Sequence, residues 1–158
     1  MTAFADCYDT IAESNESNNT RSVSVMIEEP LLPDLTITSL TAGSASYETG
    51  DVMIFTAIVK NQGDAAADSA YLSLSGGSIG TYRQSIGSLA VDATKQLSFA
   101  VYAPETALSL TLTAFADCDE IIVEEDETNN TKSISVQIVK PLLPDLTVTS
   151  VTPSKSSY

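Results

Sequence analysis

The chain has 158 residues, of which 43% are apolar, and its 21 acidic against 7 basic side chains give a formal net charge of −14. A surface of that charge repels phosphate backbones and anionic lipid, which argues against nucleic-acid and membrane-surface partners. No apolar run reaches the roughly 20 residues of a membrane span, and the sequence has no histidine, the commonest general base.

The first element predicted along the chain is a strand hairpin, whose sequence TAFADC at residues 2–7 recurs at residues 113–118. Pairing each residue with the one 111 positions later gives 28 identities in 47 pairs, including PLLPDLT at Pro30–Thr36 and Pro141–Thr147. This similarity predicts tandem repeats of 111 residues, of which the chain is an excerpt. The expected parts are the C-terminal hairpin of a preceding repeat (1–29), a Pro-rich linker (30–34), a complete unit (35–140), a second linker (141–145) and the first strand of a following repeat (146–158).

Short stretches of the complete unit alternate apolar and polar residues with period two, and turn residues separate them. In chain order the predicted strands are residues 35–40, 52–61, 70–74, 79–86, 94–102, 108–117 and 133–138. Strands of this number and length predict an all-β fold, an immunoglobulin-like antiparallel β-sandwich of about seven strands. We expect a single core that contains Phe55, Leu97, Phe99, Leu110, Leu112 and Val136.

Three segments of the unit carry a family pattern: PDLTITSL (33–40), GD followed by KNQGD (50–64), and LTAFADCDEIIVEEDETNNT (112–131). In this order they resemble CARDB, the cell-adhesion-related domain found in bacteria and in archaeal surface proteins. The most specific piece is Glu-x-Asn-Asn, which occurs at Glu16–Asn19 and Glu127–Asn130. The resemblance implies an extracellular immunoglobulin-like sandwich, usually in tandem on large surface or secreted proteins, with no catalytic residues to carry over.

The function predicted from these features is a non-enzymatic structural segment of a long extracellular tandem-repeat protein, such as a stalk, an adhesin or a filament. The sequence has no Gly-x-Ser-x-Gly, phosphate loop or Cys-x-x-Cys, so we predict no enzyme. Two alternatives stay open: a module that binds carbohydrate or Ca²⁺, and a spacer that carries a secreted enzyme. A sugar site would need exposed stacking rings, for which Tyr8, Tyr47 and Tyr82 are the candidates.

The acidic stretch at residues 117–127 is the candidate metal site. Its carboxylates suit Ca²⁺, and the residues we single out as ligands are Asp117, Asp119, Glu124 and Glu127. The alternative is a loop of solvated charges, in which the following Asn pair hydrogen-bonds the turn. In the preceding copy Ser14 and Asn15 replace two of the acidic residues, so a shared site would use only the retained positions. No other cofactor is predicted.

Three Asn-x-Ser/Thr sequons are glycosylation candidates, at Asn15, Asn18 and Asn129, although the family turn also accounts for the Asn pairs. Cys7 and Cys118 occupy equivalent positions of successive units, too far apart for a disulfide with each other. Each thiol is therefore free or bonded to another molecule.

Partners are expected to be neighbouring repeats or further copies of the chain. The proline-containing linkers are short and stiff, and we expect their leucines to pack between adjacent sandwiches, which gives a rod. A strand of the unit also has an apolar outer face, which predicts a contact surface or cover by a neighbouring domain. If the ends are natural, Leu146–Tyr158 of one molecule could pair with Met1–Ile27 of the next. The residues of this assembly surface are Val52, Ile54, Ile58, Leu31, Leu32, Leu142 and Leu143.

Overall fold

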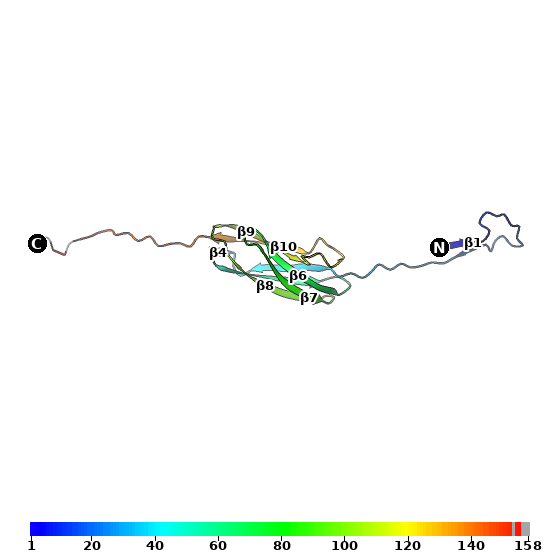
Figure 1. Ribbon diagram of the computed structural model, residues 1–158, viewed down its shortest axis with the longest axis horizontal. Coiled ribbons are helices and arrows are strands. Elements are labelled where there is room, and N and C mark those ends of the chain that lie inside the picture. The colour runs from blue at the N-terminus through cyan, green and yellow to red at the C-terminus, as the bar shows by residue number, and fades with distance from the viewer. Residues whose placement is uncertain (153, 156–158) are drawn as a thin grey trace. The chain divides into compact units, whose positions relative to one another are not determined.

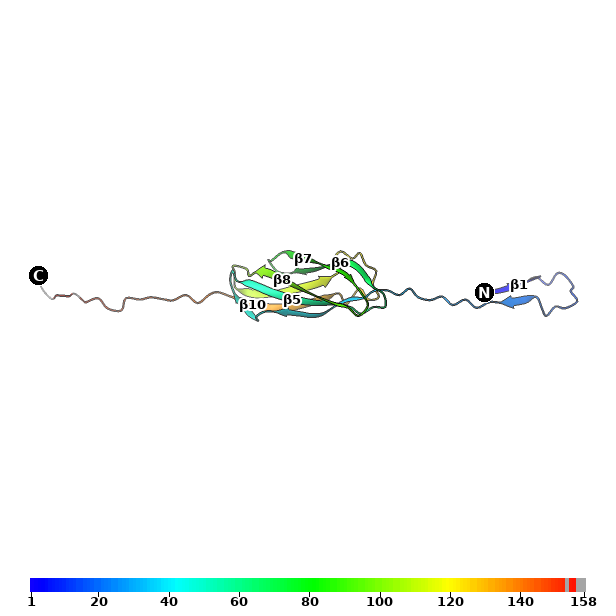
Figure 2. The same ribbon diagram turned by 90° about the horizontal axis from the view of Figure 1, so that it is seen from below.

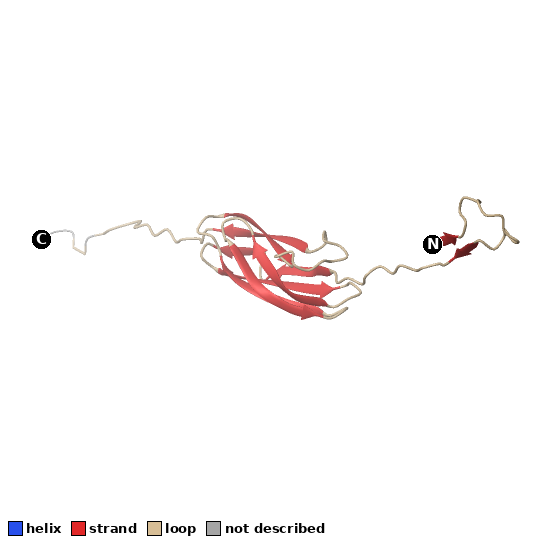
Figure 3. Cartoon of the chain, turned by 45° about the vertical axis from the view of Figure 1, so that its right-hand side comes forward, coloured by secondary structure: helices blue, strands red, loops and turns tan. Residues whose placement is uncertain are grey.

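The structure is a computed structural model that describes residues 1–152, 154 and 155. The chain divides into two compact units, Met1–Pro30 and Leu31–Tyr158. All regular elements in the described residues are strands (Figure 3). Consequently the described part contains no helix long and apolar enough to cross a membrane. Residues 146–152 of the strand predicted at residues 146–158 form no strand, and residues 153 and 156–158 lie outside the described residues.

The first unit is a two-stranded hairpin. Strand β1 (Thr2–Phe4) pairs antiparallel with β2 (Thr20–Ser22), and Thr2 lies opposite Ser22. The loop between the strands contains the first copy of the acidic sequence. That residues 1–29 are the C-terminal hairpin of a preceding repeat stays a prediction.

The second unit contains the β-sandwich, which is formed by two sheets (Figures 1 and 2). One sheet has the strand order β4-β10-β9-β6-β7 and the other has the order β3-β5-β8. The strands are β3 (Leu35–Ala42), β4 (Ser46–Glu48), β5 (Val52–Asn61), β6 (Ala67–Ser75), β7 (Thr81–Leu89), β8 (Thr94–Tyr102), β9 (Leu108–Ala116) and β10 (Thr131–Val139).

The core lies between the two sheets, where the alternating apolar residues of both sheets face one another. In β5, for example, Met53, Phe55, Ala57 and Val59 are fully buried, whereas residues between them reach solvent. All six predicted core residues are buried: Phe55, Leu97, Phe99, Leu110, Leu112 and Val136. The immunoglobulin-like sandwich and its single core are therefore confirmed.

Strand β4 is the one strand of the sandwich that the alternation pattern does not indicate. After β3 the chain crosses to the other sheet, where β4 pairs parallel with the last strand, and Glu48 lies opposite Val139. The first strand proper, β3, pairs only with β5. Of the strands at the start of the sandwich, only the short β4 therefore pairs with the last strand, β10.

The chain enters and leaves the sandwich at opposite ends. Leu35 begins β3 opposite Asn61, at the end that we call the first pole. Val139 ends β10 opposite Glu48, and its carbonyl accepts a hydrogen bond from Thr49 N (3.0 Å), at the end that we call the second pole. The acidic loop between β9 and β10 lies at the first pole, because β9 ends and β10 begins there.

Candidate functional site: the acidic loop between β9 and β10

The acidic loop begins with a tight turn at Asp117. Asp117 and Glu120 have left-handed backbone angles, with φ of 46° and 52°. The Glu120 N–H donates to the Asp117 carbonyl (2.8 Å), and Asp117 Oδ2 accepts a hydrogen bond from the N–H of Ile122 (2.8 Å). An aspartate side chain that bonds nearby backbone commonly stabilises such a turn. Part of the acidic stretch is therefore required for the shape of the loop.

The second half of the loop holds the start of β3. The buried Glu124 carboxylate accepts hydrogen bonds from the backbone N–H of Leu35 and from Asn130 Nδ2 (2.9 Å). Asn129 Nδ2 donates to Asp34 Oδ1 (2.8 Å), and Thr36 Oγ1 donates to the Asn129 carbonyl (3.3 Å). The Asn pair of the family motif thus fastens the first strand to the loop, and we call this set of contacts the β3 clasp.

Glu124 is in an unusual electrostatic environment. Burial raises the pKa of its carboxyl group to about 7, and the neighbouring charges of Glu127 and Asp117 add to the increase. The hydrogen bonds from Leu35 and Asn130 stabilise the charged form and act in the opposite direction. The clasp therefore contains a carboxyl group whose charge changes near neutral pH.

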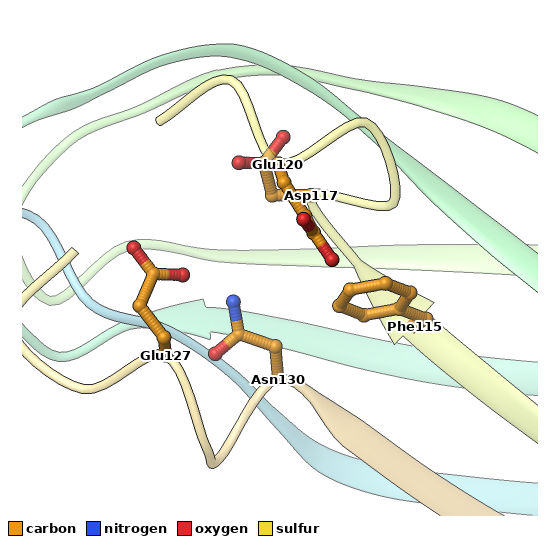
Figure 4. Close-up of a pocket in the computed structure, with 5 residues that line it drawn as sticks. All are labelled: Phe115, Asp117, Glu120, Glu127 and Asn130. Atoms are coloured by element: carbon orange, nitrogen blue, oxygen red, sulfur yellow. The ribbon is translucent and has the colours of Figure 1, made fainter. Parts of the chain in front are cut away.

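A pocket of about 380 Å³ opens beside the clasp and is lined by Phe115, Asp117, Glu120, Glu127 and Asn130 (Figure 4). In that view Asp117 and Glu127 approach from different sides and the Asn130 amide lies between them, whereas the Glu120 carboxylate points away from Asn130. Two oxygens of this pocket have no hydrogen-bond donor although they are buried, Asp117 Oδ1 and Asn130 Oδ1.

The four predicted metal ligands have separate surroundings. Asp119 forms an ion pair with Arg83, and both oxygens of Glu124 accept the hydrogen bonds of the clasp. Asp117 and Glu127 both line the pocket. In the described part of the chain, no three His, Cys, Asp or Glu side chains are grouped closely enough to hold a metal ion. The predicted set is therefore divided between an ion pair, the clasp and the pocket.

Buried polar residues behind the clasp were not singled out from the sequence. Asn61 is fully buried, and its Oδ1 accepts from the N–H of Asp34 (3.0 Å) and Gly63 (3.1 Å). Its Nδ2 donates to the carbonyls of Ala65 (2.8 Å) and Leu89 (3.0 Å). Asn61 belongs to the KNQGD segment of the family pattern, but that sequence indicates only a turn and does not show that Asn61 is buried.

The other predicted modification sites differ in exposure. Asn15 and Asn18 are exposed, whereas Asn129 is half-buried and its Nδ2, the atom that a glycan would modify, is bonded to Asp34. Both cysteines are free; Cys7 is exposed and Cys118 is half-buried. Glycosylation at the three asparagines remains a prediction.

The predicted assembly residues are mostly exposed. On the outer face of β5, Val52 and Ile54 are 52% and 44% exposed, and Tyr102, which the sequence did not suggest, lies opposite Val52. Ile58 and Leu32 are half-buried. The remaining leucines, Leu31, Leu142 and Leu143, are exposed. Packing of the linkers between adjacent sandwiches stays a prediction, because the structure contains one complete sandwich.

The same loop occurs in the first unit. Asp6 and Asp9 also have left-handed φ angles (40° and 51°), and the Asp9 N–H donates to the Asp6 carbonyl (2.9 Å). The Glu13 N–H donates to Glu16 Oε1 (2.6 Å), just as the Glu124 N–H donates to Glu127 Oε1 (3.0 Å). Both copies therefore form the same turns, although the first unit contains only a hairpin.

The fold and the loop can be compared with known proteins. The family model of CARDB matches residues 32–134, a span that includes both the clasp and the pocket. This chain belongs to the CARDB family. No curated protein sequence matches the chain.

Solved structures share the sandwich fold. The CARDB domain of the PF1109 protein of Pyrococcus furiosus, in complex with di-metal ions, has a TM-score of 0.60 at 23% identity, over 68% of this chain and 90% of that one. A domain assigned to a cell-surface protein of Methanosarcina acetivorans has a TM-score of 0.55 at 29% identity, over 70% of this chain and 95% of that one. A β-glucosidase of Erythrobacter marinus matches at 14% identity with a TM-score of 0.51, over 68% of this chain and 16% of the enzyme.

Proposed function

We propose that this CARDB chain is a non-enzymatic structural segment of a long extracellular tandem-repeat protein, a stalk, an adhesin or a filament. The observation that carries the proposal is the position of the two connections. The chain enters the sandwich at the first pole, beside Leu35, and leaves it at the second pole, beside Val139. Units joined in this way would follow one another end to end, because each linker leaves a sandwich at the pole opposite to the one at which the chain entered it. The length of the protein would therefore increase with each repeat.

The linker has properties that suit a stiff joint. Pro30 and Pro33 restrict the backbone, and the Leu32 carbonyl accepts hydrogen bonds from Asp64 N (2.9 Å) and Ala65 N (3.1 Å). Exposed apolar side chains gather beside the linker at the first pole, namely Leu31, Ile121 and Val123. A preceding sandwich would cover part of this apolar surface, and the joint would thereby resist bending.

The extracellular location rests on the family. One CARDB-like structure belongs to a cell-surface protein, and the formal net charge of −14 would keep a crowded surface protein soluble. The spacer alternative has some support, because a sandwich of the same fold occupies 16% of a β-glucosidase chain.

Carbohydrate binding is less well supported by the positions of the aromatic rings. Tyr47 and Tyr82 are half-buried and pack against the core, and the Tyr47 hydroxyl accepts a hydrogen bond from the N–H of Ser44 (2.7 Å). Tyr8 is 85% exposed, but Asp119 takes its place in the complete unit. A stacking site repeated in every unit would need a ring at that position.

The proposal is tested by small-angle X-ray scattering of proteins that carry one, two and three copies of the 111-residue unit. A ten-residue strand spans roughly 33 Å, so we expect the maximum dimension to increase by about 40 Å with each added unit. Replacing the linker prolines by glycine provides the control, which should broaden the distance distribution without unfolding the sandwiches. Compact particles whose maximum dimension hardly changes between two and three units would refute the proposal.

A further inference from the structure

The pocket at the acidic loop contains two oxygens that lack a partner. Asp117 is 1% exposed and Asn130 is 2% exposed, and both line the pocket. Each side chain is fixed through its other atom: Asp117 Oδ2 accepts the Ile122 N–H, and Asn130 Nδ2 donates to Glu124. Asp117 Oδ1 and Asn130 Oδ1 then remain without any donor. Buried oxygens without a partner are unfavourable, and a bound cation is one group that satisfies them.

The charges around these oxygens favour a cation. Three carboxylates line the pocket, those of Asp117, Glu120 and Glu127, and no basic side chain is among the lining residues. The two ion pairs found in the described residues, Lys60 with Asp92 and Arg83 with Asp119, involve none of these carboxylates. Their repulsion is therefore not relieved by protein cations.

The lining of the pocket is retained in the first copy of the sequence. Counting back 111 positions from the five lining residues gives Phe4, Asp6, Asp9, Glu16 and Asn19, so every aromatic, acidic and amide group is kept. Of the four acidic residues of the loop that do not line the pocket, three change: Asp119, Glu125 and Asp126 correspond to Tyr8, Ser14 and Asn15. The fourth, Glu124, is kept as Glu13, and it accepts the hydrogen bonds of the β3 clasp. The retained residues are thus those of the pocket and of the clasp, and the remaining acidic residues of the loop are not retained.

We propose that this pocket binds one Ca²⁺ ion through Asp117, Asn130 and Glu127, with water completing the coordination. Carboxylate and amide oxygens in irregular geometry suit Ca²⁺ better than Mg²⁺, which requires a near-octahedral shell. The amide of Asn130 is an essential ligand, because no three acidic side chains in the described part of the chain are grouped closely enough to hold a metal ion. Asp119 and Glu124, which have other partners, are not ligands.

The ion would connect the two ends of the loop. Asp117 directly follows β9, whereas Asn130 directly precedes β10 and Glu127 lies in the turn just before Asn130. Asn130 also holds Glu124 in the β3 clasp. Calcium would therefore tighten the clasp and stabilise the first pole. This inference goes beyond the proposed structural role and does not depend on it, since a single chain suffices for the test.

The experiment uses the full chain, stripped of metal with a chelator and titrated with CaCl₂ in a calorimeter and in thermal melts. We expect Ca²⁺ to raise the melting temperature at constant ionic strength, because a ligand that binds only the folded state stabilises it. Glu127→Gln should weaken the Ca²⁺ affinity at least about tenfold, and Asp117→Asn, which keeps an acceptor for Ile122, should abolish the melting shift.

Glu125→Gln is the matched control, because it removes one charge from the same loop at an exposed side chain outside the pocket. It should retain the Ca²⁺ response of the unchanged chain. An equal shift with NaCl, or an equal loss of affinity in Glu125→Gln and Glu127→Gln, would show charge screening only and overturn the site. Circular dichroism of each variant without Ca²⁺ checks that the fold is intact, and a variant that fails to fold is replaced by Asn130→Leu, which must also lose the response.

Discussion

The backbone N–H of Leu35 donates a hydrogen bond to the Glu124 carboxylate, across 89 residues of sequence. Leu35 is the first residue of β3 and is fully buried, so its N–H would otherwise lack a partner. This contact joins the first strand of the sandwich to the loop before its last strand. Stability of the fold and the protonation state of one carboxyl group are thereby linked.

The first prediction concerns pH. Because the pKa of Glu124 is raised from 4.5 to about 7, the unfolded chain ionises this group before the folded chain does. The contribution of Glu124 to the free energy of unfolding should therefore be largest below pH 4.5 and should fall as the pH rises to 7. The expected loss is on the order of 1 to 3 kcal/mol.

Urea denaturation in chelator, from pH 4.5 to pH 8, measures this effect as a difference between the unchanged chain and Glu124→Gln. As the pH rises, the free energy of unfolding of Glu124→Gln should increase relative to that of the unchanged chain. Glu125→Gln, whose side chain is exposed, should give a curve parallel to that of the unchanged chain. Parallel curves for Glu124→Gln as well would contradict the raised pKa.

A second prediction concerns the amide of Asn61. Asn61→Ala removes four hydrogen bonds and leaves the polar groups of Asp34, Gly63, Ala65 and Leu89 without that partner. We expect the free energy of unfolding to decrease by roughly 2 to 4 kcal/mol. Gln96→Ala, on the exposed side of β8, is the control and should change it by less than about 0.5 kcal/mol. A loss of the same size in both variants would argue against a special role of the amide.

A third prediction concerns the close approach at Gly63. A Cβ atom at this position would lie 2.5 Å from both Asp34 N and Leu32 O, which are backbone atoms and cannot rotate away. Gly63→Ala should therefore decrease the free energy of unfolding by about 2 kcal/mol or more. At Gly43 a Cβ would meet nothing closer than the Tyr47 hydroxyl at 3.4 Å. Gly43→Ala should consequently be tolerated, and equal thermal melts for the two variants would disprove the explanation.

Period-two alternation was sufficient to predict the seven main strands and the core, because a sandwich buries one face of each strand. It could not reveal β4, whose three residues are too short to alternate. The alternation also says nothing about polar residues that become buried. Asn61 and Glu124 occur in segments that resemble ordinary turns, and their partners are far away in the sequence.

Two of the four metal ligands named from the sequence, Asp119 and Glu124, bond other protein groups in the structure, and metal binding by the acidic loop stays a prediction. Asp119 is directed to Arg83, 36 residues earlier in the chain, and only the folded sheet brings the two together. The sequence also undervalued Asn130, because its amide was attributed to turn formation.

The last prediction concerns the outer face of β5, where Val52, Ile54 and Tyr102 are 52%, 44% and 71% exposed. Apolar side chains gathered on a sheet face favour contact with another molecule, and we predict that copies of the chain associate through this face. Sedimentation velocity at increasing concentration should show association that Ile54→Asp abolishes. Val91→Asp, at an apolar residue of similar exposure (45%) in the turn between β7 and β8, is the matched control and should leave association unchanged. A monomer at every concentration would exclude this face as a contact between copies, and the opposite poles of the sandwich would then remain the basis for assembly along the chain.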